Sequence, residues 1–494
     1  MATAGSQSSL HQNHVQRGVA TDSDADNDTD AGLESDSEDS VESESDSVIY
    51  QVEPFVTYQD RIRTLAREVL WKDVSDEDLV VERLGNGSYN RVIGIARQGN
   101  GVTGKMEYVV RIPWNHEKDD LEKDIAPLLF VKEKTQIPSP DVIVYDSTPD
   151  NVLESPYVIQ SRVPGVNAHS IIMKNDEAHK ITHDGWCKLA YDLGRVVNQM
   201  LSVHNNKPGQ LVLDSSDSRN ILIAPLQTTV GDSPEACRLD SSSQPEDTAC
   251  SLLPRLCYYQ RALDLEKDPE DTYDQMELLA RMATDMGETG HLDNIPHTFC
   301  HLDFFLRNMI ISVNPFTHEP KIEGILDWDS ALFAPAFMVC EPPAYLWNST
   351  MRGEAEDEDQ DYEDWHIDIT FDPITEEDKK VKRIFEEAAG EEYVRFAYDP
   401  VYRLARRLFQ FGIKGIHGNV AHDESEKLLE YWRTLNDAPK EVASRFPESM
   451  ESVDMEPTHQ QSDHPTMETA SDAETGLKRW LRGVKEKLRR LSTM

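Results

Sequence analysis

Basic residues are scarce in this chain of 494 residues, where 49 lysines and arginines stand against 91 aspartates and glutamates. The formal net charge of -42 would repel phosphate backbones, which excludes nucleic acid as a general partner. Cysteines are few, and none is spaced as a C-x-x-C pair or a metal-ligand set: Cys187, Cys237, Cys250, Cys257, Cys300 and Cys340. This usage favours a reducing, intracellular compartment.

Long apolar runs are also missing: none approaches the ~20 residues that cross a bilayer, and the N-terminus has no apolar signal core. We therefore expect a soluble cytoplasmic protein. Residues 1–50 are acidic and serine-rich with almost no apolar side chains, so they cannot offset their ordering entropy and are predicted to be a disordered tail. Residues 446–475 form a second acidic linker, also predicted to be disordered.

The last residues, 476–494, have the opposite character. Leucines, a valine and a tryptophan form one helical stripe, and lysines and arginines surround it. This pattern predicts a basic amphipathic helix that binds an anionic membrane or a protein partner, or that docks on the chain's own acidic surface.

Residues 301–329 hold the pattern with the clearest chemistry. His301, Asp303 and Asn308 stand in H-x-D-x-x-x-x-N spacing, and Asp327 follows an apolar pair. Two short apolar runs separated by turn formers predict a β-hairpin that brings Asn308 and Asp327 together. Amide and carboxylate oxygens suit Mg²⁺, and Asp303 is placed to accept a proton from an attacking hydroxyl. A purely structural role would explain each residue alone, since Asp303 and Asn308 could cap turns and Asp327 could end a strand. It would not explain why all of them occur in this order.

These motifs resemble the aminoglycoside phosphotransferases and related small-molecule kinases, and more narrowly a large fungal group of them. The resemblance rests on His301-Leu302-Asp303 with Asn308, and on Ile325 to Trp328. It implies Asp303 as catalytic base, with His301 in the same motif, and Asn308 and Asp327 as Mg²⁺ ligands, with ATP as donor.

The resemblance covers roughly residues 60–440 and implies an α+β, bilobal protein-kinase-like fold with disordered tails. A leading helix and a small antiparallel-sheet N-lobe would occupy residues 51–160, and a mainly helical C-lobe residues 161–445. Apolar spacing independently predicts a helix from Tyr58 to Leu70.

Several N-terminal residues are candidates for nucleotide binding. Gly85, Gly87 and Asn90 lie between two strand-like runs, as a glycine-rich hairpin over phosphates requires, although ordinary hairpin turns use the same residues. In the next strand, 108–113, Arg111 stands where the family has lysine. Asp124, in a predicted helix over 121–135, would be its acidic partner, with Glu122 and Glu133 as alternatives. Backbone groups around Gln160 and Arg162, in the strand 157–163, would recognise adenine.

Further along the chain, apolar periodicity predicts helices over 185–204, 252–286, 376–387, 400–412 and 427–435. Residues 213–250 are rich in serine, aspartate and proline and are predicted to be loop. The acidic run 354–364 is predicted to be a solvated loop, although acidic residues in this half of antibiotic-modifying relatives receive the substrate.

Two functions compete. The first is transfer of the γ-phosphoryl group of ATP to a hydroxyl of a small molecule, with Mg²⁺. The second is a catalytically weak or inactive pseudokinase-like binding protein, which Arg111 for lysine, Asp124 for glutamate and Phe305 for a polar residue would favour. A protein kinase is disfavoured because Asp327 lies in L-D-W rather than D-F-G, and no A-P-E follows.

Overall fold

A computed structural model describes residues 53–86, 90–98, 107–114, 118–172, 180–214, 216–230, 233–238, 248–267, 274–348 and 373–437. The chain divides into two units, Met1–Phe55 and Val56–Met494, and all elements below belong to the second except the first residue of α2. The expected acidic tail, the acidic run 354–364, the linker 446–475 and the basic segment 476–494 lie outside the described residues.

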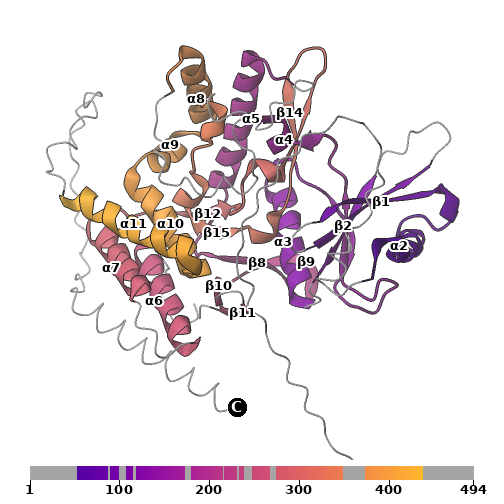
Figure 1. The fold of residues 1–494 in the computed structure, drawn as a ribbon, viewed down its shortest axis with the longest axis horizontal. Helices are drawn as coiled ribbons and strands as arrows, with labels where there is room; N and C mark the ends of the chain where they lie inside the picture. The colour runs from indigo at the N-terminus through magenta and orange to yellow at the C-terminus, as the bar shows by residue number, and fades with distance from the viewer. Residues whose placement is uncertain are drawn as a thin grey trace, which may run out of the picture. The chain divides into compact units, whose positions relative to one another are not determined.

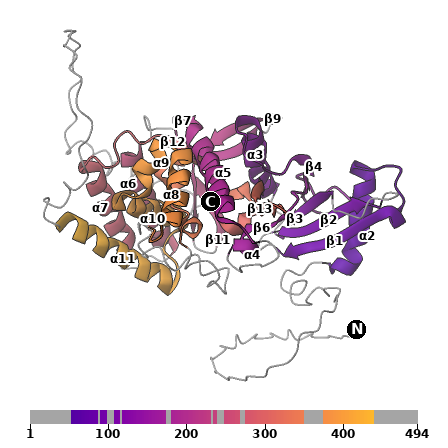
Figure 2. The same ribbon diagram turned by 90° about the horizontal axis from the view of Figure 1, so that it is seen from above.

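A five-stranded antiparallel sheet follows the leading helix α2 (Phe55–Val69) and the short turn η1 (Asp76–Asp78) (Figures 1 and 2). Its strands, in order across the sheet, are β1 (Leu79–Asn86), β2 (Asn90–Arg97), β3 (Tyr108–Pro113), β5 (Tyr157–Ser161) and β4 (Val142–Asp146). The helix buries Ile62, Leu65 and Ala66 at helical spacing, so the predicted helix is confirmed. The antiparallel pairing of β1 with β2 confirms the predicted hairpin.

The central hairpin also forms as predicted. Strands β13 (Met309–Val313) and β14 (Pro320–Ile325) pair antiparallel, with Met309 opposite Ile325, and β6 (Val166–Asn167) adds a third strand. The residues that precede β13 and follow β14 therefore lie side by side. Helix α3 (Lys118–Lys134) contacts the turn η4 (Trp328–Ser330) just beyond this hairpin, which links the first sheet to it.

Helices make up most of the rest. They are α4 (Ala168–Ile172), α5 (His183–Ser202), α6 (Ala249–Lys267), α7 (Gln275–Glu288), α8 (Glu376–Ala389), α9 (Glu391–Ala397), α10 (Pro400–Lys414) and α11 (Gly418–Asp437). The predicted helices are present, although α11 begins earlier than expected and α9 was not predicted. Helix α5 packs on α8, and α6 packs on α7 (Figure 1).

The expectation of a loop over residues 213–250 is wrong for most of the part that the structure describes, residues 213–238. A second five-stranded sheet has the order β7 (His204–Asn205), β12 (His297–Cys300), β15 (Leu332–Pro335), β8 (Gly209–Asp214) and β9 (Asp217–Ala224). A hairpin of β10 (Gln227–Val230) and β11 (Ser233–Arg238) follows. The apolar run Ile221–Ile223 of β9 pairs with β8, and this tertiary pairing outweighs the turn-rich composition around it.

An aromatic cluster at the centre of the core fixes the end of β12. The ring of Phe299 stacks on Trp328 with centroids 5.5 Å apart, and the ring of His301 lies 4.6 Å from Trp328. Because all three side chains are buried, the loop after β12 has a rigid base.

A buried arginine ties together backbone segments farther from the hairpin. The guanidinium of Arg406, in α10, donates to the carbonyl groups of Phe337 and Cys340, in and after the turn η5 (Ala336–Val339), and to those of Phe396 and Ala397 in α9. The turn η6 (Ala344–Leu346) follows η5. Hydrogen bonds of this kind compensate the hydration that a buried charge loses.

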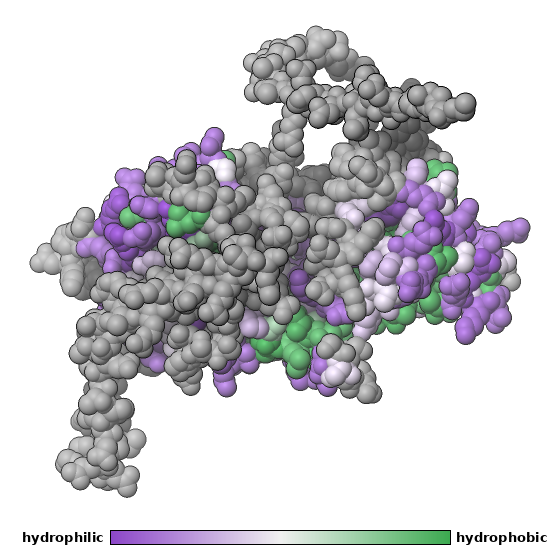
Figure 3. Space-filling model, turned by 90° about the horizontal axis from the view of Figure 1, so that it is seen from below, coloured by the Kyte–Doolittle hydropathy of each residue, from purple (hydrophilic) through white to green (hydrophobic). Residues whose placement is uncertain are grey.

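The described surface is mainly hydrophilic on the face drawn in Figure 3, with a localised hydrophobic patch near its lower edge. No helix within the described ranges is long and apolar enough to cross a bilayer. The five cysteines in those ranges are free thiols.

The packing of α5 on α8 gives a stability prediction. A Cβ at Gly194 would lie 2.6 Å from the backbone oxygen of Phe385 and 2.7 Å from the Cβ of Ala388. We expect Gly194→Ala to lower the free energy of unfolding by about 1–3 kcal/mol, because the helices must move apart. Urea denaturation measures this change.

Gly287→Ala is the matched control, because its Cβ would meet Cys250 at an ordinary 3.6 Å. This helical substitution should stabilise the protein by roughly 0.5–1 kcal/mol. Equal stabilisation by both substitutions would contradict the close approach of α5 and α8.

Candidate active site

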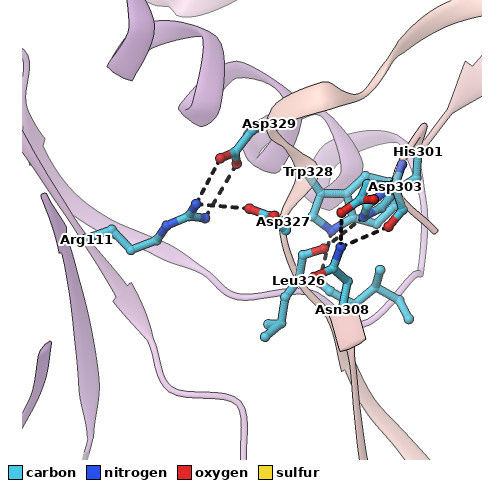
Figure 4. Close-up of polar contacts among 9 residues, drawn as sticks. Arg111, His301, Asp303, Asn308, Leu326, Asp327, Trp328 and Asp329 are labelled. Atoms are coloured by element: carbon cyan, nitrogen blue, oxygen red, sulfur yellow. Dashed lines mark hydrogen bonds and ion pairs between the residues drawn. The ribbon is translucent and has the colours of Figure 1, made fainter. Parts of the chain in front are cut away.

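The candidate site lies on the loop between β12 and β13 and on the segment after β14. Asp303 lies on the loop, and the turn η3 (Leu306–Asn308) carries Asn308 to the start of β13. The amide of Leu326 donates to the carbonyl oxygen of Asn308 at 2.8 Å, so the two segments are joined at the level of these residues. Asp327 follows in the left-handed region, with φ 59° and ψ 54°. Figure 4 shows the resulting cluster.

His301 holds the loop in place through its two ring nitrogens. Its Nδ1 accepts a hydrogen bond from the amide of Asp303 at 3.2 Å, so the proton resides on Nε2, which donates to the carbonyl oxygen of Leu326 at 2.8 Å. Burial lowers the pKa of His301, although the bond to Leu326 opposes this shift. The neutral ring thus joins the loop to the residue before Asp327.

Asp303 has both carboxylate oxygens engaged. The side-chain nitrogen Nδ2 of Asn308 donates to Oδ2 of Asp303 at 2.6 Å and to the backbone oxygen of Asp303 at 2.9 Å. Nη2 of Arg307 donates to Oδ1 at 2.5 Å. The side chain of Asp303 is 26% exposed, so the carboxylate is held in position and still open to a ligand. Because the nitrogen of Asn308 is bound to Asp303, its amide oxygen is the atom that a metal ion would use.

Arg111 reaches this cluster from strand β3. Its Nη2 lies 3.0 Å from Oδ1 of Asp327 and 2.8 Å from Oδ2 of Asp329 (Figure 4). Burial lowers the pKa of Arg111, but the carboxylates of Asp329, Asp327 and Asp124 raise it above its ordinary value. Burial raises the pKa of Asp329 to about 6; Arg111 opposes this shift and Asp327 adds to it. The charge of Asp124, in α3, thus acts on Arg111 together with those of Asp327 and Asp329, to which Arg111 donates hydrogen bonds.

The donor set fits a hard cation bound together with phosphates. The Arg111 guanidinium already lies against two carboxylates, which shows that the position attracts positive charge. In the described part of the chain, no three His, Cys, Asp or Glu side chains are arranged around a common metal position. Mg²⁺ held by substrate phosphates needs only one or two carboxylates, so Asp327 with the amide oxygen of Asn308 suffices. To bind such an ion, Asp327 would have to release its ion pair with Arg111.

The glycine-rich hairpin is described only in part. Gly85 lies in β1 opposite Val92, beside a register shift, and Asn90 is buried at the start of β2. Gly87 lies outside the described residues. The strands therefore position the hairpin as expected, and its contact with a nucleotide stays a prediction.

Gln160 and Arg111 face the same side of the first sheet. Arg111 lies opposite Val158 in β5, and Gln160 follows two residues later, so their side chains share one face. Gln160 is 5% exposed, and its buried Nε2 has no hydrogen-bond partner among the residues described. A buried donor on this face is available to a ligand.

The backbone of the expected hinge is largely occupied. The amide of Ser161 donates to the carbonyl oxygen of Asp141, and that of Arg162 donates to Glu107. The Arg162 side chain is exposed. Adenine recognition by the backbone of this segment would therefore depend on groups other than these two amides.

Sequence reasoning missed two residues of the cluster, Asp329 and Arg307. Each had a signal: Asp329 completes a D-W-D triplet, and Arg307 stands four residues after Asp303, a spacing at which side chains meet across one helical turn. The contact of Asp329 with Arg111 depends on the tertiary arrangement, whereas that of Arg307 with Asp303 is local.

An antiparallel sheet followed by a mainly helical part that contains this loop and hairpin defines a protein-kinase-like α+β fold. A sequence profile described as the phosphotransferase enzyme family matches residues 80–366. The match covers more than half of the chain, so the chain belongs to this family. The expected fold class and family are thereby confirmed.

Individual relatives are distant. "Altered inheritance of mitochondria protein 9, mitochondrial" of Candida albicans strain WO-1 is 28% identical over 150 residues, which are 28% of this chain and 23% of that protein. The protein of the same name from strain SC5314 matches equally. The alignment thus spans about a quarter of the length of these relatives.

Solved structures also align with the chain. ADP-bound aminoglycoside phosphotransferase APH(2'')-Ib is 12% identical, with a TM-score of 0.43 and coverage of 75% of this chain and 96% of that one. Choline kinase from Cryptosporidium parvum Iowa II is 12% identical, with a TM-score of 0.39 and coverage of 78% and 97%.

Removing Arg111 should make stability depend more strongly on pH. Because the folded-state pKa of Asp329 is raised above its ordinary value of 3.8, the stability that it contributes falls as the pH rises from there through about 6. Arg111→Ala removes the cation that opposes this shift. We expect a small deficit in unfolding free energy near pH 5, growing to about 1–3 kcal/mol at pH 7.5. Denaturant titrations at both pH values measure it.

Arg97→Ala serves as the control, since Arg97 pairs with Glu107 at the surface of the neighbouring strand β2. Its effect should stay below about 1 kcal/mol at both pH values. A deficit of Arg111→Ala that is constant from pH 5 to 7.5 would refute the coupling of Arg111 to Asp329.

Proposed function

We propose that this protein transfers the γ-phosphoryl group of ATP to a hydroxyl of a small molecule, with Mg²⁺. The observation that most strongly supports this is the contact of Asp303 with Asn308, held beside Asp327 by the hairpin. Membership in a phosphotransferase family supports the reaction class.

Asp303 is the proposed base. The acceptor hydroxyl donates to its carboxylate and gives up its proton there as the new oxygen–phosphorus bond forms and the bond to ADP breaks. Asn308 and Asp327 would hold Mg²⁺, which supplies charge neutralisation at the phosphates. His301 acts by positioning Asp303, because both of its ring nitrogens contact backbone groups.

The nucleotide would lie against the first sheet. Arg111 changes partners from Asp327 to the phosphates, and Asp124 keeps a negative charge near it. Gly85, Gly87 and Asn90 would cover the phosphates, and the segment of Gln160 and Arg162 would receive the base. We propose a cytoplasmic location for this activity.

A second candidate is a nucleotide-binding protein with little or no turnover. Arg111 bound to the proposed metal ligand Asp327 favours it, as does the apolar Phe305 near Asp303. Thermal stabilisation by ATP with Mg²⁺, combined with no ADP release for any acceptor, would favour this candidate.

The test of the first function is Asp303→Asn, which removes the base and keeps the shape of the side chain. With an acceptor found by screening hydroxylated metabolites for ADP release, turnover should fall about 10²–10⁴-fold. Thermal stabilisation by Mg²⁺ and ATP should persist, because the base does not bind the nucleotide.

Asp285→Asn, at an exposed position in α7, is the control and should leave turnover unchanged. ADP release by Asp303→Asn at the wild-type rate would exclude Asp303 as the base.

A further inference from the structure

Arg307 brings a positive charge to the carboxylate of Asp303. Its Nη2 lies 2.5 Å from Oδ1 of Asp303, and the two side chains are 28% and 26% exposed. The carbonyl oxygen of Arg307 accepts a hydrogen bond from the side-chain amide of Asn167 at 2.6 Å, and both neighbours of Arg307, Leu306 and Asn308, are buried. The backbone that carries the guanidinium is thus fixed, and the side chain is partly exposed.

Phe305 forms a platform for this guanidinium. Cζ of Arg307 lies 4.5 Å from the centroid of the Phe305 ring, within the range of a cation–π contact. The apolar residue two positions after Asp303 therefore does not leave this part of the loop without a cation. It directs the charge of Arg307 back toward Asp303.

The chemistry then places this charge near the transferring group. A hydroxyl that loses its proton to Asp303 must lie within hydrogen-bond distance of the carboxylate. The hydroxyl oxygen forms the new bond to phosphorus, so the phosphoryl group lies next to that oxygen. A guanidinium bound to the same carboxylate is therefore within reach of the phosphoryl oxygens. Its planar fork suits those oxygens, and phosphoryl transfer relies mainly on neutralising their charge.

The local balance of charge points the same way. Asp303, Asp327 and Asp329 bring three carboxylates to the cluster, and an incoming nucleotide adds further negative charge. Arg111 offsets the pair Asp327 and Asp329 from the sheet side, and Arg307 offsets Asp303 from the loop side. Without Arg307, the phosphoryl group would approach Asp303 against uncompensated repulsion.

We propose that Arg307 is a catalytic residue that contacts the γ-phosphoryl group of the nucleotide during transfer. This inference rests on the proposed phosphotransferase function. It assigns to Arg307 a contact that ATP makes and ADP cannot make, and this difference can be measured without knowing the acceptor.

The experiment compares the binding of ATP and ADP, each with Mg²⁺, by isothermal titration calorimetry. Arg307→Met removes the charge and keeps much of the side chain. We expect it to weaken ATP binding about tenfold and to leave ADP binding unchanged, while turnover with an accepted substrate falls about 10²–10³-fold. Arg307→Lys keeps the charge and should recover part of both losses.

The matched control is Arg281→Met. Arg281 also donates at 2.5 Å to an acid four residues earlier, Glu277, but on the exposed surface of α7. It should change neither affinity. An ATP-to-ADP affinity ratio unchanged by Arg307→Met would overturn the assignment. Faster turnover of this variant would also overturn it, because Arg307 would then inhibit Asp303 rather than assist transfer. Failure of the wild-type protein to bind ATP would instead overturn the proposed function, and this inference with it.

Discussion

The contact of Arg111 with Asp327 and Asp329 is the interaction on which the candidate site depends. It joins strand β3 of the first sheet to the segment after β14, which lies more than 200 positions later in the chain. Two carboxylates so close together repel each other, and burial increases the energy of that repulsion. The guanidinium offsets it and holds the sheet against the hairpin.

The same contact sets a condition for the proposed phosphoryl transfer. A ligand that binds Asp327 competes with Arg111. The ion pair of Arg111 with Asp327 would then be replaced by two others, one between Arg111 and the nucleotide phosphates and one between Asp327 and the metal ion. Arg111 can bind phosphate oxygens while a metal ion binds Asp327, and in that exchange no group has to be left unpaired. An arginine suits this exchange because its guanidinium contacts two carboxylates at once, through Nη2 to Asp327 and Asp329 and through Nη1 to Asp329.

Much of this arrangement could be predicted from the sequence because local patterns carry it. The turn formers and apolar runs of residues 309–325 specify the hairpin, and the spacing from His301 to Asn308 specifies the loop. The strand β9 was not predicted, because its apolar residues 221–224 lie within a segment of turn-forming composition, and only pairing with β8 makes them a strand. Strand formation of this kind depends on partners that are distant in sequence.

The contacts of Arg111 with Asp327 and Asp329 escaped prediction for a similar reason. Family resemblance directed attention to Asp124 as the acid near Arg111, and helix position alone could not rank it against Asp329. Which acid lies near Arg111 depends on how α3, with Asp124, packs against η4, with Asp329. No local sequence pattern encodes this packing. The position of Arg307 over Phe305 was accessible in principle, since both lie within one turn of Asp303.

The left-handed backbone at Asp327 has a consequence for how related sequences are interpreted. With φ at 59°, this position disfavours most side chains, and aspartate, asparagine and glycine are the residues that tolerate it best. A descendant that had lost all catalysis would still be under pressure to keep a short polar residue there, simply to turn the chain. An aspartate retained at this position in a related sequence is therefore a weak indicator of activity. The loop residues around Asp303 carry no such backbone requirement, so they are the better indicators.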